Sequence, residues 1–272
     1  MLKFVDAKSI LTETKLPGLD YSLNPFRGCT IGCPYCYSPD VLRETREWGK
    51  FLDVKENAPQ LLEKELRTKK RGLIGIGTVT DGYVQAEREL KMTRRCLEKI
   101  LEAGWPVSIQ TKSSLVVRDL DLLKRFKEKG LEVEVGFTIT TLDPRVSAVL
   151  EPFASPPLER IAAMKEIHDA GIRVWCFVGP IYPGFDSQCE ELVRRIAGAG
   201  CDRVLSHRFA LHRTAWARVK KALEEKMPEQ VTEWEHTLFT EEGKKFFDTA
   251  YKQLADACGR YHIKHEFAFG KP

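Results

Sequence analysis

The chain has 272 residues, of which 43% are hydrophobic and 30% charged, so it has enough apolar side chains for a substantial core. Its formal net charge of +4 is too small to indicate nucleic-acid binding by itself. The absence of any apolar run of roughly 18 residues argues against a membrane span, and eight cysteines without a secretory leader lead us to expect a cytoplasmic protein.

The first predicted feature is a strand followed by a loop, residues 24–40, that reads NPFRGCTIGCPYCYSPD. Cys29, Cys33 and Cys36 give this loop a C-x3-C-x2-C spacing, and the glycines and prolines around them favour a tight turn. Three neighbouring thiolates can bind zinc or an iron–sulfur cluster, and both normally have four ligands. Because the next cysteine is Cys96, we favour a cluster that keeps one iron open. The alternatives are a structural zinc loop and three unlinked thiols.

Beyond this loop, amphipathic helical stretches alternate with short apolar strands. The predicted helices are 59–70, 87–103, 119–129, 158–170 and 189–199. The predicted strands are 73–81, 106–113, 133–141, 172–181 and 202–207. Together with the first strand, they make six βα units, a pattern typical of a parallel sheet with helices outside it. Periodicity alone does not separate an open doubly wound sheet from a partial barrel.

Polar side chains follow several of these strands at the point where each strand ends. They are Thr78, Thr80, Asp81, Gln110, Lys112, Ser113, Thr138, Thr140 and Thr141. Because parallel strands present their carboxyl ends at one edge, we expect these residues near the cysteine loop. Any single Thr or Ser can instead simply begin a turn. Lys112 is a cation at this edge and suits a carboxylate ligand.

The cysteine motif, with Tyr35 before its last cysteine, resembles that of the radical S-adenosylmethionine superfamily. The strings NPFRGC, QTKS, TITTLD and LEPFASPPLERI resemble the spore photoproduct lyase-like branch, also called DNA repair photolyase-like, over about residues 23 to 186. The resemblance implies a partial (β/α)6 TIM-like barrel over residues 1–207. Residues 208–272 would form a helical C-terminal extension that packs on the barrel or closes it.

The resemblance also implies two cofactors, a [4Fe-4S] cluster on Cys29, Cys33 and Cys36 and S-adenosylmethionine beside it. Lys112 would contact the carboxylate of S-adenosylmethionine. The implied S-adenosylmethionine contacts are Tyr35, Tyr37, Thr78, Thr80, Asp81, Lys112, Thr138, Thr140, Glu151, Arg160, Pro180 and Ile181. Of these, Glu151 and Arg160 can equally be surface charges, and Pro180 and Ile181 can equally be strand core.

The expected reaction follows from the family. The reduced cluster cleaves S-adenosylmethionine to a 5′-deoxyadenosyl radical, which abstracts hydrogen from a substrate that the sequence does not identify. The resemblance implies an oxygen-sensitive, lyase-type or transferase-type enzyme. Reduced flavodoxin or ferredoxin would donate the electron, and a nucleic acid is a possible substrate. The alternative function is a non-catalytic iron–sulfur or zinc protein that binds nucleic acid.

One departure from the photoproduct lyase pattern concerns the hydrogen donor. That enzyme has a hydrogen-donating cysteine near the end of its second strand, where this chain reads GTVTD, so dimer reversal by that route is not expected. Cys176 can take the role of hydrogen donor if its side chain points into the barrel. The alternative is a buried cysteine that packs like a small apolar residue.

The C-terminal part changes character from Arg208. Residues 208–226 hold six basic and two acidic residues, which can contact phosphates or form the solvated face of a helix. Thr240, followed by two glutamates, predicts the start of a helix that runs to about Tyr261. Residues 262–269 are predicted to form a short closing strand.

Overall fold

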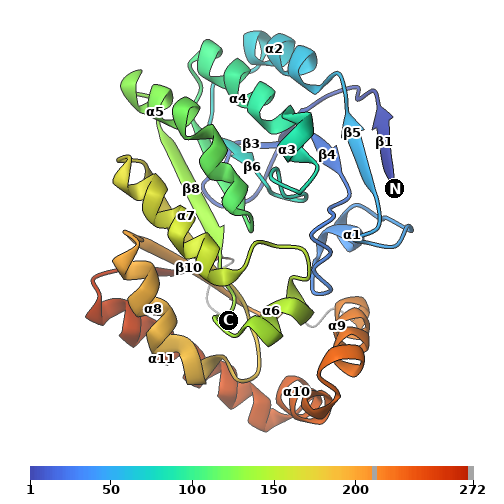
Figure 1. Ribbon diagram of the computed structural model, residues 1–272, viewed down its shortest axis with the longest axis vertical. Helices are drawn as coiled ribbons and strands as arrows, with labels where there is room; N and C mark the ends of the chain where they lie inside the picture. Colours follow the sequence, from blue (N-terminus) through green and yellow to red (C-terminus); the bar gives the residue numbers. More distant parts are fainter. Residues whose placement is uncertain (210–212, 269–272) are drawn as a thin grey trace.

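The computed structural model describes residues 1–209 and 213–268, which form two sheets with helices packed around the larger one (Figure 1). The larger sheet has the strand order β11-β10-β9-β8-β7-β6-β3-β2. These strands are β2 (Leu11–Glu13), β3 (Tyr21–Leu23), β6 (Ile74–Ile76), β7 (Val107–Thr111), β8 (Val133–Thr138), β9 (Arg173–Ile181), β10 (Arg203–Arg208) and β11 (Lys264–Phe267). Neighbouring strands are parallel except β2 and β3, which are antiparallel.

Helices connect the parallel strands, because a parallel pair needs a long crossover. These helices are α2 (Ala58–Thr68), α3 (Glu87–Leu90), α4 (Met92–Ala103), α5 (Leu120–Glu128), α6 (Pro144–Leu150), α7 (Pro157–Asp169) and α8 (Cys189–Gly198), with 3₁₀ turns η1 (Ser114–Asp119) and η2 (Phe185–Gln188). Within the described ranges, β2 and β11 do not pair with each other, so the sheet is an open, partial barrel. The predicted six βα units are confirmed with β3 as the first strand, whereas the strand directly before Cys29, which the prediction counted, pairs in a second sheet.

The two faces of the main sheet differ in chemistry, because successive side chains on a strand point to opposite sides. Val135 and Phe137 of β8, and Val174 and Cys176 of β9, are at most 1% exposed and lie on the helix-covered face. Burial of each large apolar side chain stabilises the fold by about 1.5–3 kcal/mol. The opposite, concave face carries most of the polar strand residues and is the side on which a ligand can bind.

The amino-terminal end of the concave face is filled by side chains. Nη2 of Arg203 lies 3.1 Å from both carboxylate oxygens of Glu134, and Ser108 Oγ donates to Glu134 at 2.8 Å. The guanidinium of Arg203 covers the ring of Trp175, 5.3 Å from its centroid. Trp175 in turn occupies the space that a side chain at Gly136 would need. This packing leaves the carboxyl ends of the strands for a functional site.

Two predicted elements are broken at a single residue. The predicted strand 73–81 is reduced to β6, because Gly77 turns the chain with a φ of 93°. A Cβ at Gly77 would lie 2.0 Å from the carbonyl oxygen of Gln110. The predicted helix 87–103 is interrupted at Lys91, whose φ of 51° separates α3 from α4. Residues 77–81 therefore form a bent segment beside the sheet edge.

A second, smaller sheet lies beside the barrel and was not predicted. Its order is β1-β5-β4, with β1 (Leu2–Val5), β5 (Leu52–Lys55) and β4 (Phe26–Arg27). Strand β4 leads directly into the cysteine loop, and Phe51, just before β5, packs against Gly28 at the start of that loop. A side chain at position 28 would collide with Phe51, and the φ of 83° there also favours glycine. This sheet therefore anchors the loop.

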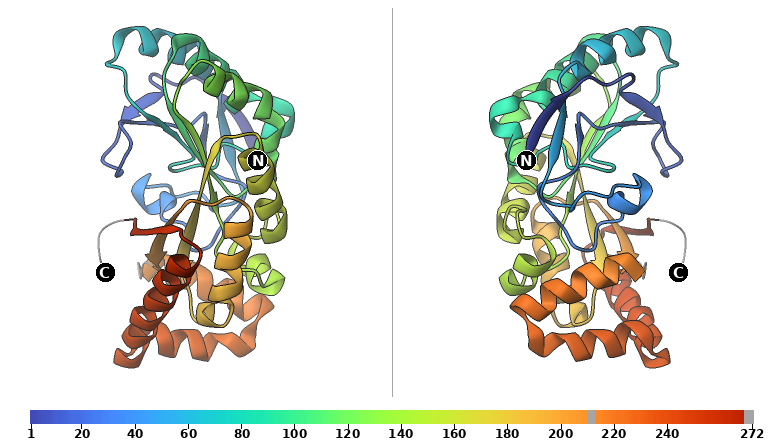
Figure 2. Two further views of the ribbon diagram at one scale, coloured as in Figure 1. Left: turned by 90° about the vertical axis from the view of Figure 1, so that its left-hand side faces the viewer. Right: turned by 90° about the vertical axis from the view of Figure 1, so that its right-hand side faces the viewer.

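The C-terminal part lies at the lower end of the molecule in Figure 2 and packs against α6, α8 and the β10 edge of the sheet. It comprises α9 (Arg213–Lys226), η3 (Pro228–Gln230), α10 (Val231–Phe239), α11 (Glu241–Arg260) and β11. The predicted helix start at Thr240 is confirmed, because its hydroxyl accepts a hydrogen bond from Gly243 N. Strand β11 pairs with β10 at the sheet edge, whereas α6 and α10 were not predicted. No helix in the described part of the chain has the length and apolarity needed to cross a membrane.

Candidate cofactor site

The cysteine loop joins β4 to helix α1 (Ser38–Val41) at the carboxyl edge of the sheet. Two backbone turns shape it, with Gly32 N donating to Cys29 O at 3.2 Å and Cys36 N donating to Cys33 O at 3.1 Å. Cys29 and Cys33 are 8% and 6% exposed, and Cys36 is partly buried. The loop thus gathers three thiols on a short, well-ordered path of the backbone.

The chemistry of the three thiols fits an iron–sulfur cluster. Burial raises the pKa of Cys29 to about 12, and the nearby charge of Asp81 adds to this effect. Burial likewise raises the pKa of Cys33, which Lys112 partly offsets. As thiolates, these side chains need cationic partners, which bound iron supplies. In the described part of the chain, no three Cys, His, Asp or Glu side chains are arranged to hold a single metal ion.

Asn24 organises the bent segment that follows β6. Its Oδ1 accepts hydrogen bonds from the backbone N–H groups of Val79 and Thr80, both at 3.3 Å. Its Nδ2 donates to Thr78 Oγ1 at 2.9 Å, and the hydroxyl of Tyr37 donates to the Thr78 carbonyl. Sequence reasoning missed Asn24, although it opens the NPFRGC string. Thr78 and Tyr37 therefore help to hold the loop against β6.

In the bent segment, Thr80 is the predicted cofactor contact whose side chain has a polar atom without a hydrogen-bond partner in the described part of the chain. It is 2% exposed, and its Oγ1 has no hydrogen-bond partner within the described residues. A buried hydroxyl without a partner costs free energy, so it is a natural contact for a bound polar ligand. The geometry is therefore consistent with the predicted contact between Thr80 and a cofactor.

Asp81 links the ends of β6 and β7. Its carboxylate accepts hydrogen bonds from Thr111 Oγ1 and from Lys112 N, both at 2.7 Å, and from Tyr83 N at 2.8 Å. These three bonds occupy both carboxylate oxygens. We therefore interpret Asp81 as a brace that sets the position of Lys112 rather than as a direct ligand contact.

Lys112 is a partly buried cation at the edge of the cysteine loop. Its Nζ lies 5.8 Å from the centre of the Tyr35 ring and makes no hydrogen bond or ion pair within the part of the chain that the structure describes. Burial acts to lower its pKa, but Cys33, Glu151 and Asp81 outweigh burial and raise the pKa. Lys112 therefore stays charged at neutral pH and is suited to bind an anionic group.

Glu151 and Arg160 form a buried ion pair beneath Tyr35. Arg160 Nη2 lies 2.5 Å from Glu151 Oε2, and the two residues are 0% and 2% exposed, respectively. Burial acts to raise the pKa of Glu151, but Arg160 and Lys112 outweigh it and lower the pKa. Glu151 therefore carries its charge at neutral pH. The alternative that these residues are surface charges is wrong, since both are buried.

This ion pair ties the cysteine loop to β8. Tyr35 OH donates to Glu151 Oε1 at 2.6 Å, and Thr140 Oγ1 donates to the same oxygen at 3.2 Å. Arg160 also donates to the Thr138 carbonyl at 2.6 Å and the Ser155 carbonyl at 2.7 Å. These contacts use the polar groups that sequence reasoning had assigned to a ligand. We therefore interpret Glu151 and Arg160 as positioning groups for Tyr35.

The predicted residues on β9 (Arg173–Ile181) are Cys176, Pro180 and Ile181. Cys176 pairs in register with Phe137 and Val204 on the helix-covered face. Burial raises its pKa, and Cys201 and Cys258 contribute further. Cys258 belongs to the outer helix α11, so the Cys176 thiol faces the helix layer and we do not retain it as a hydrogen donor. Pro180 and Ile181 are buried at the end of β9, which fits strand core.

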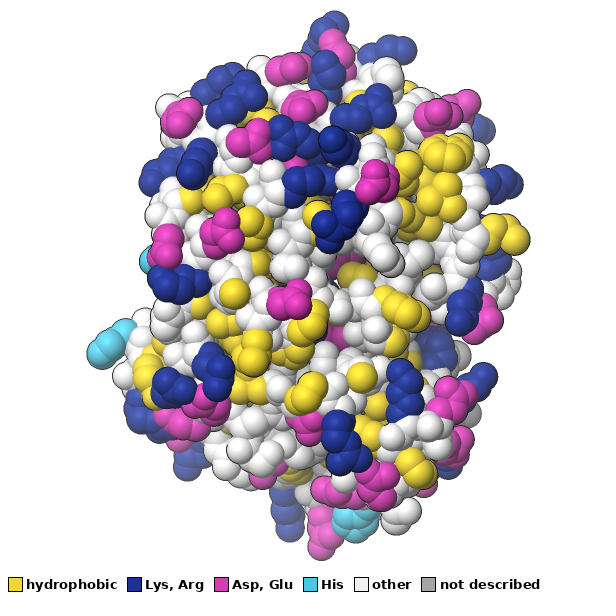
Figure 3. All heavy atoms as spheres, in the orientation of Figure 1, with side chains coloured by type: hydrophobic (Ala, Val, Ile, Leu, Met, Phe, Trp, Pro, Cys, Tyr) yellow, Lys and Arg dark blue, Asp and Glu magenta, His cyan; other side chains and the backbone are white. Residues whose placement is uncertain are grey.

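Several basic side chains of residues 208–226 form hydrogen bonds with other parts of the chain. Arg218 donates to loop carbonyls, Lys220 Nζ donates to Glu235 at 2.6 Å, and Lys226 Nζ donates to the Ala148 carbonyl at 2.7 Å. His212 and the Arg213 side chain lie outside the described residues. Acidic and basic side chains are interspersed over the face in Figure 3. Neither observation favours a phosphate-binding stripe on α9.

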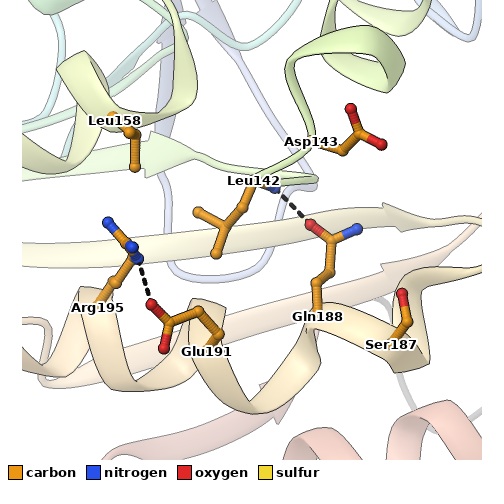
Figure 4. A pocket seen from close by; sticks show the side chains of 7 residues that line it. All are labelled: Leu142, Asp143, Leu158, Ser187, Gln188, Glu191 and Arg195. Carbon is orange, nitrogen blue, oxygen red and sulfur yellow. Dashed lines mark hydrogen bonds and ion pairs between the residues drawn. The ribbon is translucent and has the colours of Figure 1, made fainter.

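A surface hollow of about 430 Å³ lies between the β8–α6 connection and α8 (Figure 4). Its lining includes Gln188, Glu191 and Arg195. Gln188 Oε1 already accepts from Leu142 N at 2.5 Å, and Glu191 already pairs with Arg195 at 2.6 Å. None of the predicted site residues lines this hollow. The chemistry at the cysteine loop therefore identifies the candidate site better than the shape of the surface does.

Comparison with known proteins is consistent with this location. The family model described as "Radical SAM superfamily" matches residues 23–196. An uncharacterised protein of Methanocaldococcus jannaschii is 35% identical over 181 residues, which cover 66% of this chain and 67% of that protein. An uncharacterised protein of Mycobacterium tuberculosis is 30% identical over 206 residues, covering 71% of this chain and 58% of that protein.

Two further similarities concern proteins with more informative names. A radical SAM Nα-GlyT isomerase of Pseudomonas phage M6 is 26% identical over 66% of this chain and 38% of its own length. A solved structure of a spore photoproduct lyase mutant, with bound AdoMet and dinucleoside spore photoproduct, superposes with a TM-score of 0.73 at 16% identity. It covers 99% of this chain and 82% of that one. At this identity, the structural match supports the fold alone.

Proposed function

This chain belongs to the radical S-adenosylmethionine superfamily, and we propose that it is an enzyme that abstracts a hydrogen atom from its substrate at the carboxyl edge of the partial barrel. The observation that carries the proposal is the set of three clustered thiols beside the charged Lys112 and the unpartnered hydroxyl of Thr80. All three features lie at the edge where parallel α/β folds place their chemistry.

Its cofactors are a [4Fe-4S] cluster and S-adenosylmethionine. When bound, they supply a carbon radical through one-electron cleavage of S-adenosylmethionine. Cys29, Cys33 and Cys36 would hold the cluster. Lys112 would place its charge against the carboxylate of S-adenosylmethionine, and Thr80 would offer its hydroxyl to the same molecule. The aromatic side chain of Tyr35, fixed by Glu151, would form one wall.

The rest of the chain positions these groups and limits solvent access. Asp81 fixes the backbone at Lys112, and Asn24 fixes the backbone at Thr80. The packed Arg203 and Trp175 close the opposite end of the concave face. Substrate and cofactor would therefore meet at one edge only. We assign no protein hydrogen donor, since Cys176 faces the helices.

We propose the electron donor and the substrate class separately from the reaction itself. We propose reduced flavodoxin or ferredoxin as the donor. We propose a nucleic acid as the substrate, by analogy with the structurally similar photoproduct lyase that was solved with a dinucleoside spore photoproduct. Fold similarity does not determine substrate, so DNA, RNA, a peptide and a small metabolite should be compared directly.

The direct test uses the full chain under anaerobic conditions. After reconstitution with iron and sulfide and chemical reduction, we expect added S-adenosylmethionine to yield 5′-deoxyadenosine and to change the electron paramagnetic resonance spectrum. A cluster that forms without either change would contradict the enzyme proposal. That outcome would favour the alternative, a non-catalytic iron–sulfur protein that binds nucleic acid, for which salt-dependent DNA or RNA binding is the measurement.

Replacing Lys112 by methionine is expected to weaken S-adenosylmethionine binding roughly tenfold or more, because a charge-assisted contact is worth about 1.5–3 kcal/mol. Cluster content should not change, since Lys112 is not a cysteine ligand. Calorimetric titration of the reconstituted protein measures the effect. Lys165→Met, which removes an exposed partner of Asp169, is the matched control. If the two variants bind S-adenosylmethionine with equal affinity, Lys112 is not part of the binding site.

A further inference from the structure

Helix α9 contacts the cysteine loop through one side chain that sequence reasoning had left in a possible phosphate-binding stripe. Arg218 donates from Nε to the Pro34 carbonyl at 3.0 Å and from Nη2 to the Cys36 carbonyl at 2.7 Å. The two hydrogen bonds span the peptide segment around Tyr35. The fork of the guanidinium thus binds the backbone of the loop on both sides of that residue.

The same helix also holds the residues that follow the loop. Arg218 Nη2 lies 3.6 Å from Asp40 Oδ2, and Thr214 Oγ1 donates to Asp40 Oδ1 at 3.0 Å. Asp40 belongs to α1, which lies next to α9 in Figure 1. Two side chains of α9, Thr214 and Arg218, therefore contact the segment that follows the cysteine motif.

Cys36 is the cysteine that most needs this support. Cys29 and Cys33 are buried, whereas Cys36 is only partly buried. On the far side of Cys36, the Tyr37 hydroxyl binds the Thr78 carbonyl. Arg218 adds a hydrogen bond to the Cys36 carbonyl itself, so the chain around Cys36 is held both by α9 and by the segment that follows β6.

We propose that Arg218 is a positioning residue for Cys36 and that α9 acts as a latch on the cluster-binding loop. This inference rests on the proposed function, because it concerns retention of the cluster. A planar, permanently charged guanidinium can bind two carbonyls at once, whereas a lysine ammonium reaches them only as a point charge. By thermodynamic linkage, a bound cluster and a docked α9 stabilise each other.

The test compares Arg218→Gln, Arg218→Lys and the control Lys220→Gln, which changes a neighbouring side chain that binds Glu235 instead of the loop. Each anaerobically reconstituted protein is mixed with an iron chelator, and the rate of iron release is followed. We expect Arg218→Gln to release iron roughly 10- to 100-fold faster than the wild type, because losing an outer partner of a metal ligand typically lowers metal affinity by that factor and weaker binding is expressed mainly in dissociation. The iron-release rate of Arg218→Lys should lie between those of Arg218→Gln and the wild type. The rate of Lys220→Gln should equal that of the wild type.

Hydrogen exchange of the metal-free proteins separates the latch from general stability. In Arg218→Gln, faster exchange should be confined to about residues 33–41, whereas Lys220→Gln should exchange there as the wild type does. Wild-type iron release in Arg218→Gln, or equally faster exchange over the whole chain, would overturn the latch. If the wild type binds no cluster, the proposed function fails, while the exchange comparison still decides whether Arg218 holds the loop.

Discussion

Replacing Cys33 by alanine is expected to abolish the cluster and the cleavage of S-adenosylmethionine. Cys33 is the central thiol of the motif and is 6% exposed, so no outside ligand can easily take its place. Loss of an outer partner alone costs 10- to 100-fold in metal affinity, so loss of a ligand should cost at least about two orders of magnitude. Iron and sulfide analysis, visible absorption and 5′-deoxyadenosine yield measure the effect.

Cys176→Ala is the matched control for this prediction, because it removes another buried thiol from the same chain. The Cys176 side chain faces the helix layer, so we expect full cluster content and normal production of 5′-deoxyadenosine. Small apolar packing losses should appear only as reduced stability. Retention of the cluster in Cys33→Ala, or its loss in Cys176→Ala, would contradict the assignment of the ligands.

Replacing Glu151 by glutamine is expected to destabilise the metal-free protein by about 3–5 kcal/mol, since it leaves the guanidinium of Arg160 buried without its counter-charge. The pair is at most 2% exposed, so water cannot compensate for the lost carboxylate. Tyr35 would also lose a charged acceptor. Urea unfolding followed by circular dichroism gives the free energy of unfolding.

Glu63→Gln provides the control, because Glu63 pairs with Arg67 on the exposed surface of α2. Exposed pairs contribute less than about 1 kcal/mol, so this variant should unfold almost as the wild type does. The paired change Glu151→Leu with Arg160→Met should recover part of the loss, because no charge then stays buried alone. Equal stability of Glu151→Gln and Glu63→Gln would show that the buried pair is not needed.

The stabilising effect of the Glu151 charge should also appear in the pH dependence of the free energy of unfolding. The pKa of Glu151 is lowered in the folded protein, because Arg160 and Lys112 outweigh the effect of burial. Its contribution is therefore present above the unfolded pKa, near 4.3, and is lost as the pH falls through the lower folded value. Glu151→Gln should lack this part of the acid-induced loss of stability. Urea unfolding between about pH 3 and pH 6 makes the comparison.

The repeated part of the fold was predictable because its patterns are long. The connecting helices α2, α4, α5, α7 and α8 each span several turns, and each strand is a short apolar run, so six βα units could be counted. The small sheet could not be found this way, because Phe26–Arg27 is too short to show any period. The break at Lys91 depends on a local φ that the pattern of apolar residues does not encode.

Site residues that lie close together in the sequence could be predicted. Roles that depend on a partner far along the chain could not. The thiols lie within eight consecutive residues, and Lys112 follows an apolar strand, so both could be singled out. Asp81 resembled a ligand contact until its bonds to Thr111 and Lys112 were seen. Arg218 and Cys36 are 182 positions apart, and nothing in either segment indicates the other.

This separation also sets an order of events during protein synthesis. The cysteine loop leaves the ribosome long before the helix that holds it, and 182 residues take roughly 10 to 40 s at 5–20 residues per second. Through that interval the three thiols are exposed to oxidants without α9, and for much of it also without Glu151 and Arg160. Cluster insertion is therefore expected to follow completion of the chain, and a nascent chain stalled before α9 should hold iron poorly.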